Sequence, residues 1–371
     1  MAEWKKVRLG DIVKTNQNTY SPKEKWGYVN YLDTGNLTMN RIDSIQYIDL
    51  SKEKLPSRAK RKVKYNSIVY STVRPNQLHY GIVKDKPENF LVSTGFVVVD
   101  VDYGVANPDY IYYILTQREI TEHLQAIGEQ SVSAYPSIKP SDIENLEVYL
   151  PGLEEQERIV SILSAIDEKE RNNCAINNNL QQQAQAIYTS TFIANAEPTW
   201  KQGHLSDLIT VKYGKDHKKL ADGRYPVYGS GGIMRFVERP LYDKESVLIP
   251  RKGTLNNVMY VNQPFWSVDT MFYTEMRSPN VAKFVYHFVK TKDLASMNAG
   301  SAVPSMTTDI LNAMEVTIPS ATALEEFEML VAPMYKAMQE NNVQSEKLAN
   351  LRDALLPKLM SGELDVSNID L

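Results

Sequence analysis

Residues that could carry catalytic chemistry are few in this chain, and none of them completes a catalytic set. An adenine methyltransferase needs an Asn-Pro-Pro-Tyr-like loop to hold a flipped base. The nearest string, Asn107-Pro108-Asp109-Tyr110, lacks the second proline and opens a predicted helix instead. The string Gly229-Ser230-Gly231-Gly232 has neither the lysine nor the following helix of a phosphate-binding loop. These patterns argue against a methyltransferase and against a translocase acting alone.

Nuclease and metal chemistry are no better supported. A nuclease would have to pair Pro108-Asp109 with Asp167-Glu168-Lys169, and the second group falls on a predicted long helix, remote from any strand. The single cysteine, Cys174, provides neither a zinc site nor a cysteine triad, and the histidines do not cluster at ligand spacing. These histidines are His79, His123, His204, His217 and His287. We therefore expect no catalytic residue, no metal and no cofactor on this chain.

The first half of the chain instead offers residue types that bind DNA. Between Lys52 and Lys64, seven basic residues oppose only Glu53, a density that suits contact with phosphates, although a solubilising loop is an alternative interpretation. A predicted strand then leads into forked and amide side chains that can read base edges. The candidates are Lys60, Arg61, Lys62 and Lys64 for phosphates, and Arg74, Asn76, Gln77, His79 and Tyr80 for bases.

The second half repeats this combination. Lys212, Lys215, Lys218 and Lys219 form a candidate phosphate patch. A later loop supplies Arg251, Lys252, Asn256 and Asn257 as candidate base readers. Tyr228, Ser230 and the adjoining glycines could bring the backbone close to DNA, and a purely structural turn explains them equally well.

Composition places these candidates in a globular protein. The chain has 371 residues, of which 43% are hydrophobic and 23% charged, which suits two folded domains. The net charge of −4 is unevenly spread: residues 1–150 and 200–320 are near-neutral to basic, and the two intervening or terminal stretches are acidic. One cysteine, no signal-like opening and no apolar run of membrane-spanning length predict a cytoplasmic protein without a membrane partner.

The sequence also repeats itself. Trp4 to Val13 recurs as Trp200 to Ile209, and Tyr135 to Pro151 returns as Val303 to Pro319. Each copy of the second motif is followed by a Leu-Glu-Glu that opens a helical stretch. The repeat predicts a domain over residues 1–150, a long helix over 151–195, a similar domain over 196–320 and a long helix over 321–371.

Short runs of β-branched and aromatic residues between turns predict strands in both domains, and two amphipathic stretches predict helices. The fold class is therefore α/β, in the sense of a mixed α+β domain that occurs twice. The expected strands are Ser67–Val73, Phe96–Val101, Ser246–Ile249 and Met271–Thr274, and the expected helices are Pro108–Leu124 and Val281–Leu294.

The two long helices should pack on each other. Each has an apolar stripe at three-four spacing, and each has asparagines in its middle that a long pair would bury. Chain connectivity makes the pair an antiparallel coiled coil with a pseudo-two-fold axis, and Pro333 should kink the second helix or mark its start. The first helix, from about Glu154 to Phe192, would be roughly 58 Å long and would separate the domains.

At this point the residues resemble a known family, the specificity (S) subunits of type I restriction-modification enzymes. The resemblance covers essentially the whole chain. It rests on the order of several strings: LPGLEEQERIVSILSAID (150–167), STGF (93–96), AYPSIKPSDIENL (134–146), YPVYGSGGI (225–233), RKGT (251–254) and LLPKLMSGEL (355–364).

The resemblance implies a non-catalytic reader of double-stranded DNA. Each domain would be a target-recognition domain that reads one half of a bipartite target. The helices would hold methyltransferase (M) subunits, and restriction (R) subunits could join; S-adenosylmethionine, ATP and Mg would be bound by these partners. Two alternatives stay open: a coiled-coil scaffold whose end domains bind proteins, and the specificity chain of a methyltransferase-nuclease outside type I.

Overall fold

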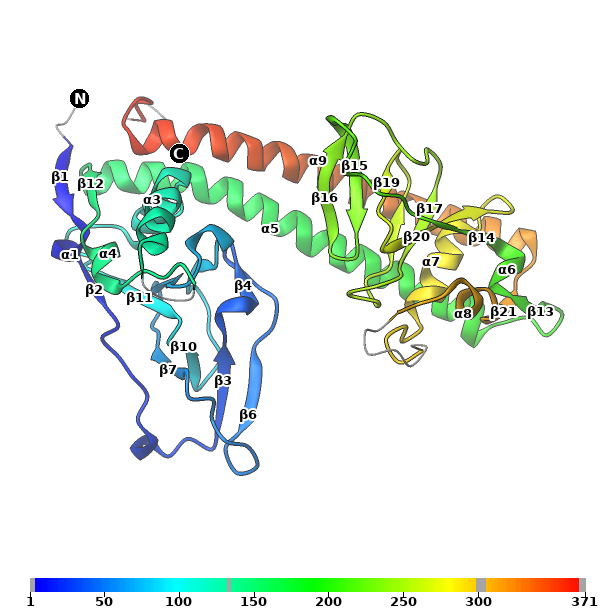
Figure 1. The fold of residues 1–371 in the computed structure, drawn as a ribbon, viewed down its shortest axis with the longest axis horizontal. Helices are drawn as coiled ribbons and strands as arrows, with labels where there is room; N and C mark the ends of the chain where they lie inside the picture. The colour runs from blue at the N-terminus through cyan, green and yellow to red at the C-terminus, as the bar shows by residue number, and fades with distance from the viewer. Residues whose placement is uncertain (1–3, 132–134, 298–304, 367–371) are drawn as a thin grey trace. The chain divides into compact units, whose positions relative to one another are not determined.

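A computed structural model describes residues 4–131, 135–297 and 305–366 (Figure 1). The chain divides into two compact units: unit 1 comprises Met1–Arg171 with Gln344–Leu371, and unit 2 comprises Asn172–Val343. Each unit thus takes a globular part and half of each long helix. The domain boundaries expected from the repeat stay a prediction, since the compact units are divided within the helices. Val303 and Pro304, which open the second copy of one repeated motif, lie outside the described residues.

Unit 1 contains two four-stranded sheets. One has the order β2-β11-β8-β9 and is antiparallel; the other has the order β6-β3-β10-β7, in which β10 runs parallel to β3. Two smaller ladders join β1 to β12 and β4 to β5. The strands are β1 (Lys5–Arg8), β2 (Val13–Thr15), β3 (Tyr28–Leu32), β4 (Leu37–Thr38), β5 (Arg41–Ile42), β6 (Gln46–Asp49), β7 (Ala59–Lys62), β8 (Ile68–Ser71), β9 (Tyr80–Ile82), β10 (Phe90–Ser93), β11 (Phe96–Val101) and β12 (Glu147–Leu150).

Unit 2 repeats this topology. Its antiparallel sheet has the order β14-β20-β17-β18, and a three-stranded sheet has the order β16-β15-β19 with β15 and β19 parallel. A β13–β21 ladder corresponds to β1–β12. The strands are β13 (Lys201–His204), β14 (Ile209–Tyr213), β15 (Asp222–Gly229), β16 (Gly232–Val237), β17 (Ser246–Pro250), β18 (Met259–Val261), β19 (Trp266–Ser267), β20 (Met271–Met276) and β21 (Glu315–Ile318). The predicted mixed α/β class and the internal repeat are confirmed.

In each unit one helix packs against the antiparallel sheet, and the chain also forms two much longer helices. Within the described residues no helix combines the length and the apolar composition needed to cross a bilayer. The helices are α1 (Leu9–Ile12), α2 (Pro108–Leu115), α3 (Arg118–Glu129), α4 (Pro140–Glu144), α5 (Leu153–Thr189), α6 (Leu205–Leu208), α7 (Ala282–Lys290), α8 (Thr308–Asn312) and α9 (Ala321–Met360). Short turns of 3-10 helix are η1 (Pro22–Glu24), η2 (Thr34–Asn36) and η3 (Pro75–Gln77), and a π-helical turn, η4 (Ser190–Ala194), ends α5.

Two helix predictions need correction. The stretch from Pro108 to Leu124 is two helices rather than one, because Gln117 adopts an extended conformation with ψ 142° between α2 and α3. Of the two roles expected for Pro333, a kink or the start of the second helix, the second is wrong. The helix begins at Ala321, where Ser320 Oγ accepts a hydrogen bond from the Ala323 backbone N–H, and it continues through the proline.

The long helices run antiparallel in unit 2, and asparagines join them. Asn341 Nδ2 donates to Asn177 Oδ1 and Asn177 Nδ2 donates to Asn342 Oδ1, both at 2.8 Å. Asn173, one turn earlier on α5, donates to the carbonyl of Asn341, whereas Asn177 also donates to the carbonyl of Met338. Partner numbers fall on α9 as they rise on α5, which defines the antiparallel direction. The expected burial of these asparagines is met in part: Asn173 is buried, and Asn177 and Asn341 are half-buried, whereas the others in the middle of the two helices are exposed.

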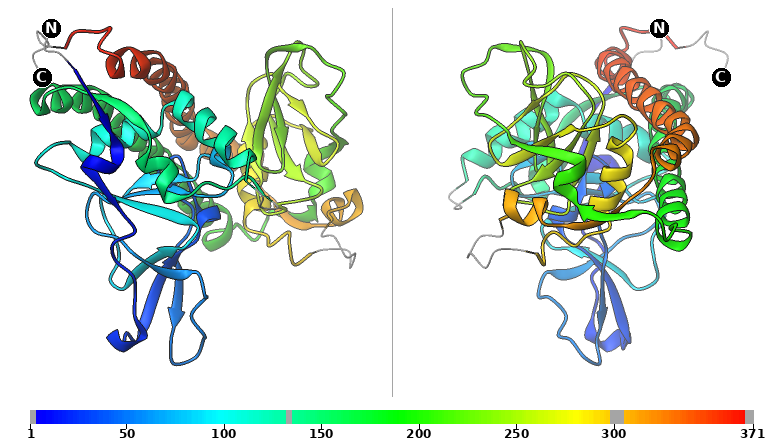
Figure 2. Two further views of the ribbon diagram at one scale, coloured as in Figure 1. Left: turned by 60° about the vertical axis from the view of Figure 1, so that its left-hand side comes forward. Right: turned by 90° about the vertical axis from the view of Figure 1, so that its right-hand side faces the viewer.

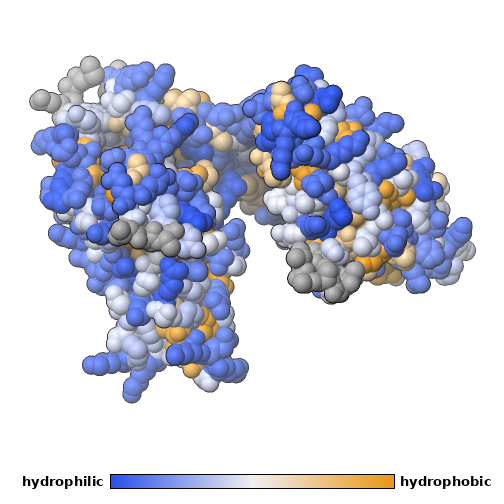
Figure 3. Space-filling model, in the orientation of Figure 1, coloured by the Kyte–Doolittle hydropathy of each residue, from blue (hydrophilic) through white to orange (hydrophobic). Residues whose placement is uncertain are grey.

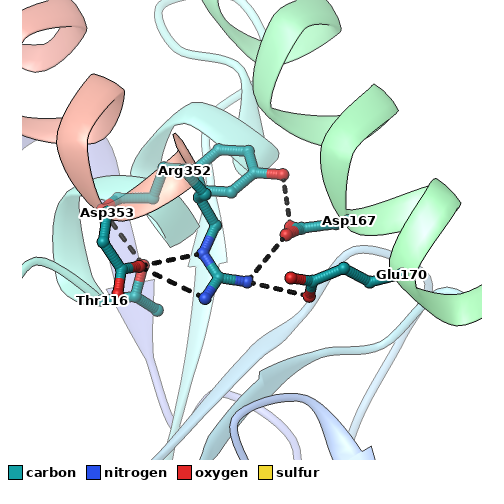
Figure 4. Close-up of polar contacts among 6 residues, drawn as sticks. Thr116, Asp167, Glu170, Arg352 and Asp353 are labelled. Carbon is teal, nitrogen blue, oxygen red and sulfur yellow. Dashed lines mark hydrogen bonds and ion pairs between the residues drawn. The ribbon is translucent and has the colours of Figure 1, made fainter. Parts of the chain in front are cut away.

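In unit 1 the end of α9 lies along the start of α5, as both views in Figure 2 show. Arg352 on α9 fixes this contact: its guanidinium lies 3.2 Å from carboxylate oxygens of both Asp167 and Glu170 on α5 (Figure 4). Tyr113 of α2 donates its hydroxyl to Asp167 at 2.7 Å. One cluster therefore ties both long helices to the globular part of unit 1.

Candidate nucleic-acid interface

An arginine follows the same strand of the antiparallel sheet in both units. In unit 1 it is Arg74, three residues beyond β8; in unit 2 it is Arg251, directly after β17. Each loop is held by pairing with a segment late in its unit. Arg74 N–H donates to the carbonyl of Pro136 at 2.9 Å, and Met306 N–H donates to the carbonyl of Arg251 at 2.9 Å. The two arginines thus lie in the same loop of each unit, two residues apart in register: the bridges Val73–Ser137 and Lys252–Ser305 correspond, so Arg251 matches Thr72 rather than Arg74.

Each arginine also lies over an exposed tyrosine. The guanidinium carbon of Arg74 is 4.6 Å from the ring centre of Tyr135, and that of Arg251 is 5.4 Å from the ring centre of Tyr213. The two tyrosines are 55% and 52% exposed. Stacking on an aromatic face limits the rotation of a guanidinium while leaving its edge donors available. A planar fork matches the O6 and N7 acceptors of guanine, although in Arg251 the Nη1 atom already donates to the carbonyl of Asp269 at 3.4 Å.

Sequence reasoning had not assigned these tyrosines to the site. Tyr135 lies within a motif of the repeat, but its counterpart partner Tyr213 comes from β14, far from Arg251 in sequence. The two aromatic partners occupy different positions in the two halves. No spacing in the sequence could have identified Tyr213, because only the folded sheet, in which β20 lies between β14 and β17, brings Tyr213 near Arg251.

Of the other predicted base readers in unit 1, two are exposed and two contact other parts of the protein. Asn76 and Gln77 are exposed on η3 beside Arg74. His79 holds another segment in place, because its Nδ1 lies 2.6 Å from the carbonyl oxygen of Leu37. Tyr80 is a correction: it is 5% exposed and stacks on Tyr70 in the core, where burial raises its pKa to about 12. A side chain packed in this way has no free edge for a base.

In unit 2 most of the predicted asparagine contacts are already used within the protein. Asn256 Nδ2 donates to Asp293 at 3.0 Å, and its Oδ1 accepts from the Ala295 N–H at 3.1 Å. Asn257 Nδ2 donates to the carbonyl of Ser230 at 2.8 Å, so these amides shape the loop. Lys252 is exposed beside Arg251.

Tyr228 is a second correction. It is 9% exposed, and its hydroxyl accepts a hydrogen bond from Gln263. Burial raises its pKa above the usual value. Ser230, two residues later, is half-buried at the end of β15 and is the accessible residue of this pair.

Only the second half of the basic run of unit 1 includes a strand. Lys60, Arg61 and Lys62 all lie on β7, and Lys64 follows it. Lys62 is paired with Glu24 and Lys64 with Asp100, whereas Lys60 is exposed. Arg61 is half-buried, and burial lowers its pKa; among the described residues its Nε has no hydrogen-bond partner.

The lysines of unit 2 lie near the arginine site. Lys212 is on β14 and pairs with Glu275 at 3.7 Å; Lys215, Lys218 and Lys219 follow that strand and are exposed. Because Tyr213 is on the same stretch as these lysines and supports Arg251, the candidate phosphate patch and the candidate base reader adjoin each other in unit 2.

The strings that could have suggested catalysis have structural roles. Asn107 caps α2, accepting hydrogen bonds from the N–H groups of Asp109 and Tyr110, and Tyr110 is fully buried. Asp167 lies on α5 in the Arg352 cluster. Across the described ranges, no group of three or more histidine, cysteine or acidic side chains could hold a metal ion.

Comparisons with known proteins agree along the whole chain. Residues 1–182 and 197–326 match the family described as the type I restriction modification DNA specificity domain. The type I restriction enzyme HindI specificity subunit of Haemophilus influenzae is 23% identical, with 98% of this chain and all of that protein aligned. The MjaIX specificity subunit of Methanocaldococcus jannaschii is 22% identical, over 98% of this chain and 94% of that protein.

A solved structure has the same fold. The crystal structure of a type I restriction-modification system S subunit from M. genitalium aligns with 96% of this chain and 96% of its own, at a TM-score of 0.58 and 20% sequence identity.

Proposed function

The chain belongs to the family of type I restriction-modification DNA specificity proteins, and from this premise we propose that units 1 and 2 each read one half of a bipartite DNA target. Its role in that family is that of a DNA sequence-specificity subunit. The single observation that carries the proposal is that the same loop of each unit has an arginine lying over an exposed tyrosine. One such arginine in each unit suits a DNA target made of two half-sites, with bases between them that the protein does not read.

The catalytic steps are assigned to partner subunits. Methyl transfer needs S-adenosylmethionine and a pocket for a flipped adenine. The only Asn-Pro string that resembles the loop of such a pocket caps α2 instead. We assign S-adenosylmethionine, ATP and Mg to the methyltransferase and restriction subunits, and DNA contact to this chain. The purified chain alone is expected neither to methylate nor to cleave DNA.

Methyltransferase subunits are proposed to bind the long helices, which together would form the antiparallel coiled coil. Apolar side chains remain exposed on both: Met329 is 72% and Leu330 58% exposed on α9, and Ile176 is 45% exposed on α5. Exposed apolar residues along a helix are typical of a face covered by a protein partner.

Replacing Leu330 by aspartate is expected to reduce retention of the methyltransferase subunit at least about tenfold, because a desolvated carboxylate opposes a protein interface. Co-purification of the co-expressed subunits measures this. Stability of the chain should change little, since Leu330 is 58% exposed. Lys336→Ala, on the same helix with a 78% exposed side chain, is the matched control and should retain the partner. Full retention by the Leu330 variant would place the partner elsewhere.

Replacing Lys60, Arg61 and Lys62 together by alanine is expected to weaken DNA binding on every sequence and to make its salt dependence shallower, because phosphate contacts release counterions. Lys60 and Arg61 should account for most of the effect, since Lys62 is already paired with Glu24. Titration of the chain with its methyltransferase subunit at several salt concentrations gives the slope. An unchanged slope of the salt dependence would mean that β7 does not contact phosphates and that its basic residues serve solubility.

A gel shift in the presence of the methyltransferase subunit tests the proposal as a whole. The complex should shift DNA that carries its target more strongly than DNA of scrambled sequence. Equal shifts on both would favour the alternative, a scaffold whose end domains bind proteins.

A further inference from the structure

A small hairpin with an apolar tip lies against the Arg74 loop in unit 1. Strands β4 and β5 are joined by Met39 and Asn40, both in the left-handed region at φ 47° and 62°. Met39 is 44% exposed and Ile42 47% exposed. The tip is fixed to the loop, because Met39 N–H donates to the carbonyl of Leu78 at 2.9 Å.

In unit 2 a different hairpin places exposed apolar side chains next to the Arg251 loop. Strands β15 and β16 form a hairpin at the edge of their sheet, with Gly232 at φ 114° in its turn. Just beyond the turn, Ile233 is 52% and Met234 61% exposed. The turn is fixed to the Arg251 loop, since Asn257 donates to the carbonyl of Ser230 at 2.8 Å.

These two hairpins are not copies of each other. In unit 1 the hairpin is a separate two-stranded ladder, whereas in unit 2 it includes the edge strand of a sheet that corresponds to β6-β3-β10-β7. Shared ancestry of the repeat therefore does not explain why each arginine loop has an exposed methionine and an exposed isoleucine next to it. Met39 also occupies the left-handed backbone region, which is strained for a residue other than glycine. On the face drawn in Figure 3, apolar residues are scattered in small groups on a mostly hydrophilic surface.

We propose that the apolar tips, Met39 with Ile42 in unit 1 and Ile233 with Met234 in unit 2, contact the bases of the half-site that the adjoining arginine reads. This inference rests on the proposed function and adds a second specificity device to each unit. The occupant is DNA because the surroundings are cationic: Arg41 adjoins Met39, and Lys252 belongs to the loop held against the turn of β15 and β16. Apolar side chains recognise bases through the thymine methyl group or by wedging into a base step.

The test uses the chain assembled with its methyltransferase subunit, and methylation is measured on duplexes changed at one base pair at a time. Met234→Ala should lower methylation of the intact target about tenfold. It should also reduce the penalty for base changes in the half-site that responds to Arg251→Ala, and in that half-site only. Met39→Ala should do the same in the other half-site. Ile193→Ala and Val105→Ala, which remove exposed aliphatic side chains of units 2 and 1, should leave both unchanged.

Two further measurements fix the chemistry. The salt dependence of binding should keep its slope in the Met234 and Ile233→Ser variants, because no phosphate contact is removed. A 2-aminopurine placed in the half-site distinguishes wedging into a base step from contact with a thymine methyl group. Its fluorescence should rise on binding of the unaltered complex, and rise less with Met234→Ala, if the side chain wedges between bases. An unchanged fluorescence identifies contact with the methyl group.

Several outcomes would overturn the inference. They are unchanged methylation and discrimination in both methionine variants, a flattened salt slope, or loss of the methyltransferase subunit on co-purification, which would make the tips a protein contact. Failure of the proposed function looks different, since the unaltered complex would then methylate without preferring any sequence. Thermal unfolding of each variant checks that the chain remains folded.

Discussion

Arg251→Ala is expected to weaken discrimination in one half of the target while leaving the other half intact. A guanidinium that makes a bidentate contact with guanine contributes about 1–3 kcal/mol, or roughly 5- to 150-fold in binding. Its stacking on Tyr213 at 5.4 Å holds the fork in position, so Arg251→Lys should recover little of the lost specificity. The measurement is methylation of duplexes that differ by single base pairs.

Arg74→Ala is the comparable variant in unit 1 and should produce the same loss in the opposite half-site, because Arg74 lies over Tyr135 in the same loop of its unit. If either variant lowered methylation equally on every sequence, its arginine would contact a phosphate rather than a base. Loss in the same half-site for both variants would contradict the assignment of one half to each unit.

Arg352→Ala is expected to destabilise unit 1 by about 2–4 kcal/mol. The side chain of Arg352 is 18% exposed and lies 3.2 Å from two carboxylates, of which that of Glu170 is 10% exposed. Removing the cation leaves a buried acidic group, Glu170, near a half-buried one, Asp167, which costs more than the pair itself contributes. Urea denaturation of the full chain measures the difference, and Arg118→Ala, which breaks an exposed pair with Glu122, is the control.

The loss should depend on pH in a defined direction. Burial already raises the pKa of Glu170 above its usual value, against the opposing charge of Arg352. The folded state therefore binds this proton more tightly than the unfolded chain, and the contribution of Glu170 to stability falls as pH rises. Without the guanidinium the pKa rises further, so the destabilisation by Arg352→Ala should be larger at pH 7 than at pH 5. A deficit that grows on acidification would contradict this account of the cluster.

Much of the fold could be predicted from the sequence because its signals are local and repeated. The strands β8, β11, β17 and β20 lie within or close to the predicted runs, and the first long helix runs from Leu153 to Thr189 against an expected start near Glu154. The break between α2 and α3 was missed because one extended residue, Gln117, separates two stretches of similar periodicity. Pro333 does not mark the start of the second helix, because a proline inside a long helix removes one hydrogen bond without ending it; the alternative, a kink at Pro333, stays a prediction.

The candidate site was less accessible to sequence reasoning. Arg74 and Arg251 could be selected by residue type and position after a strand, whereas their tyrosine partners come from segments that only the tertiary fold brings near. Tyr80 was included as a base reader because its position after His79 suggested a loop. The strand β9 begins there, and strand pairing turns the ring into the core.

The most direct test of the central claim is a genome-wide map of methylated adenines in cells that express the methyltransferase subunit with and without this chain. With the chain, methylation should fall on a single motif of two short defined sequences separated by a fixed number of unspecified bases. In the Arg251→Ala variant, the bases of one of those two sequences should become less defined while the other stays unchanged. A continuous motif without an unread interval, or the same methylation pattern in the absence of the chain, would contradict the proposal that its two units read a divided target.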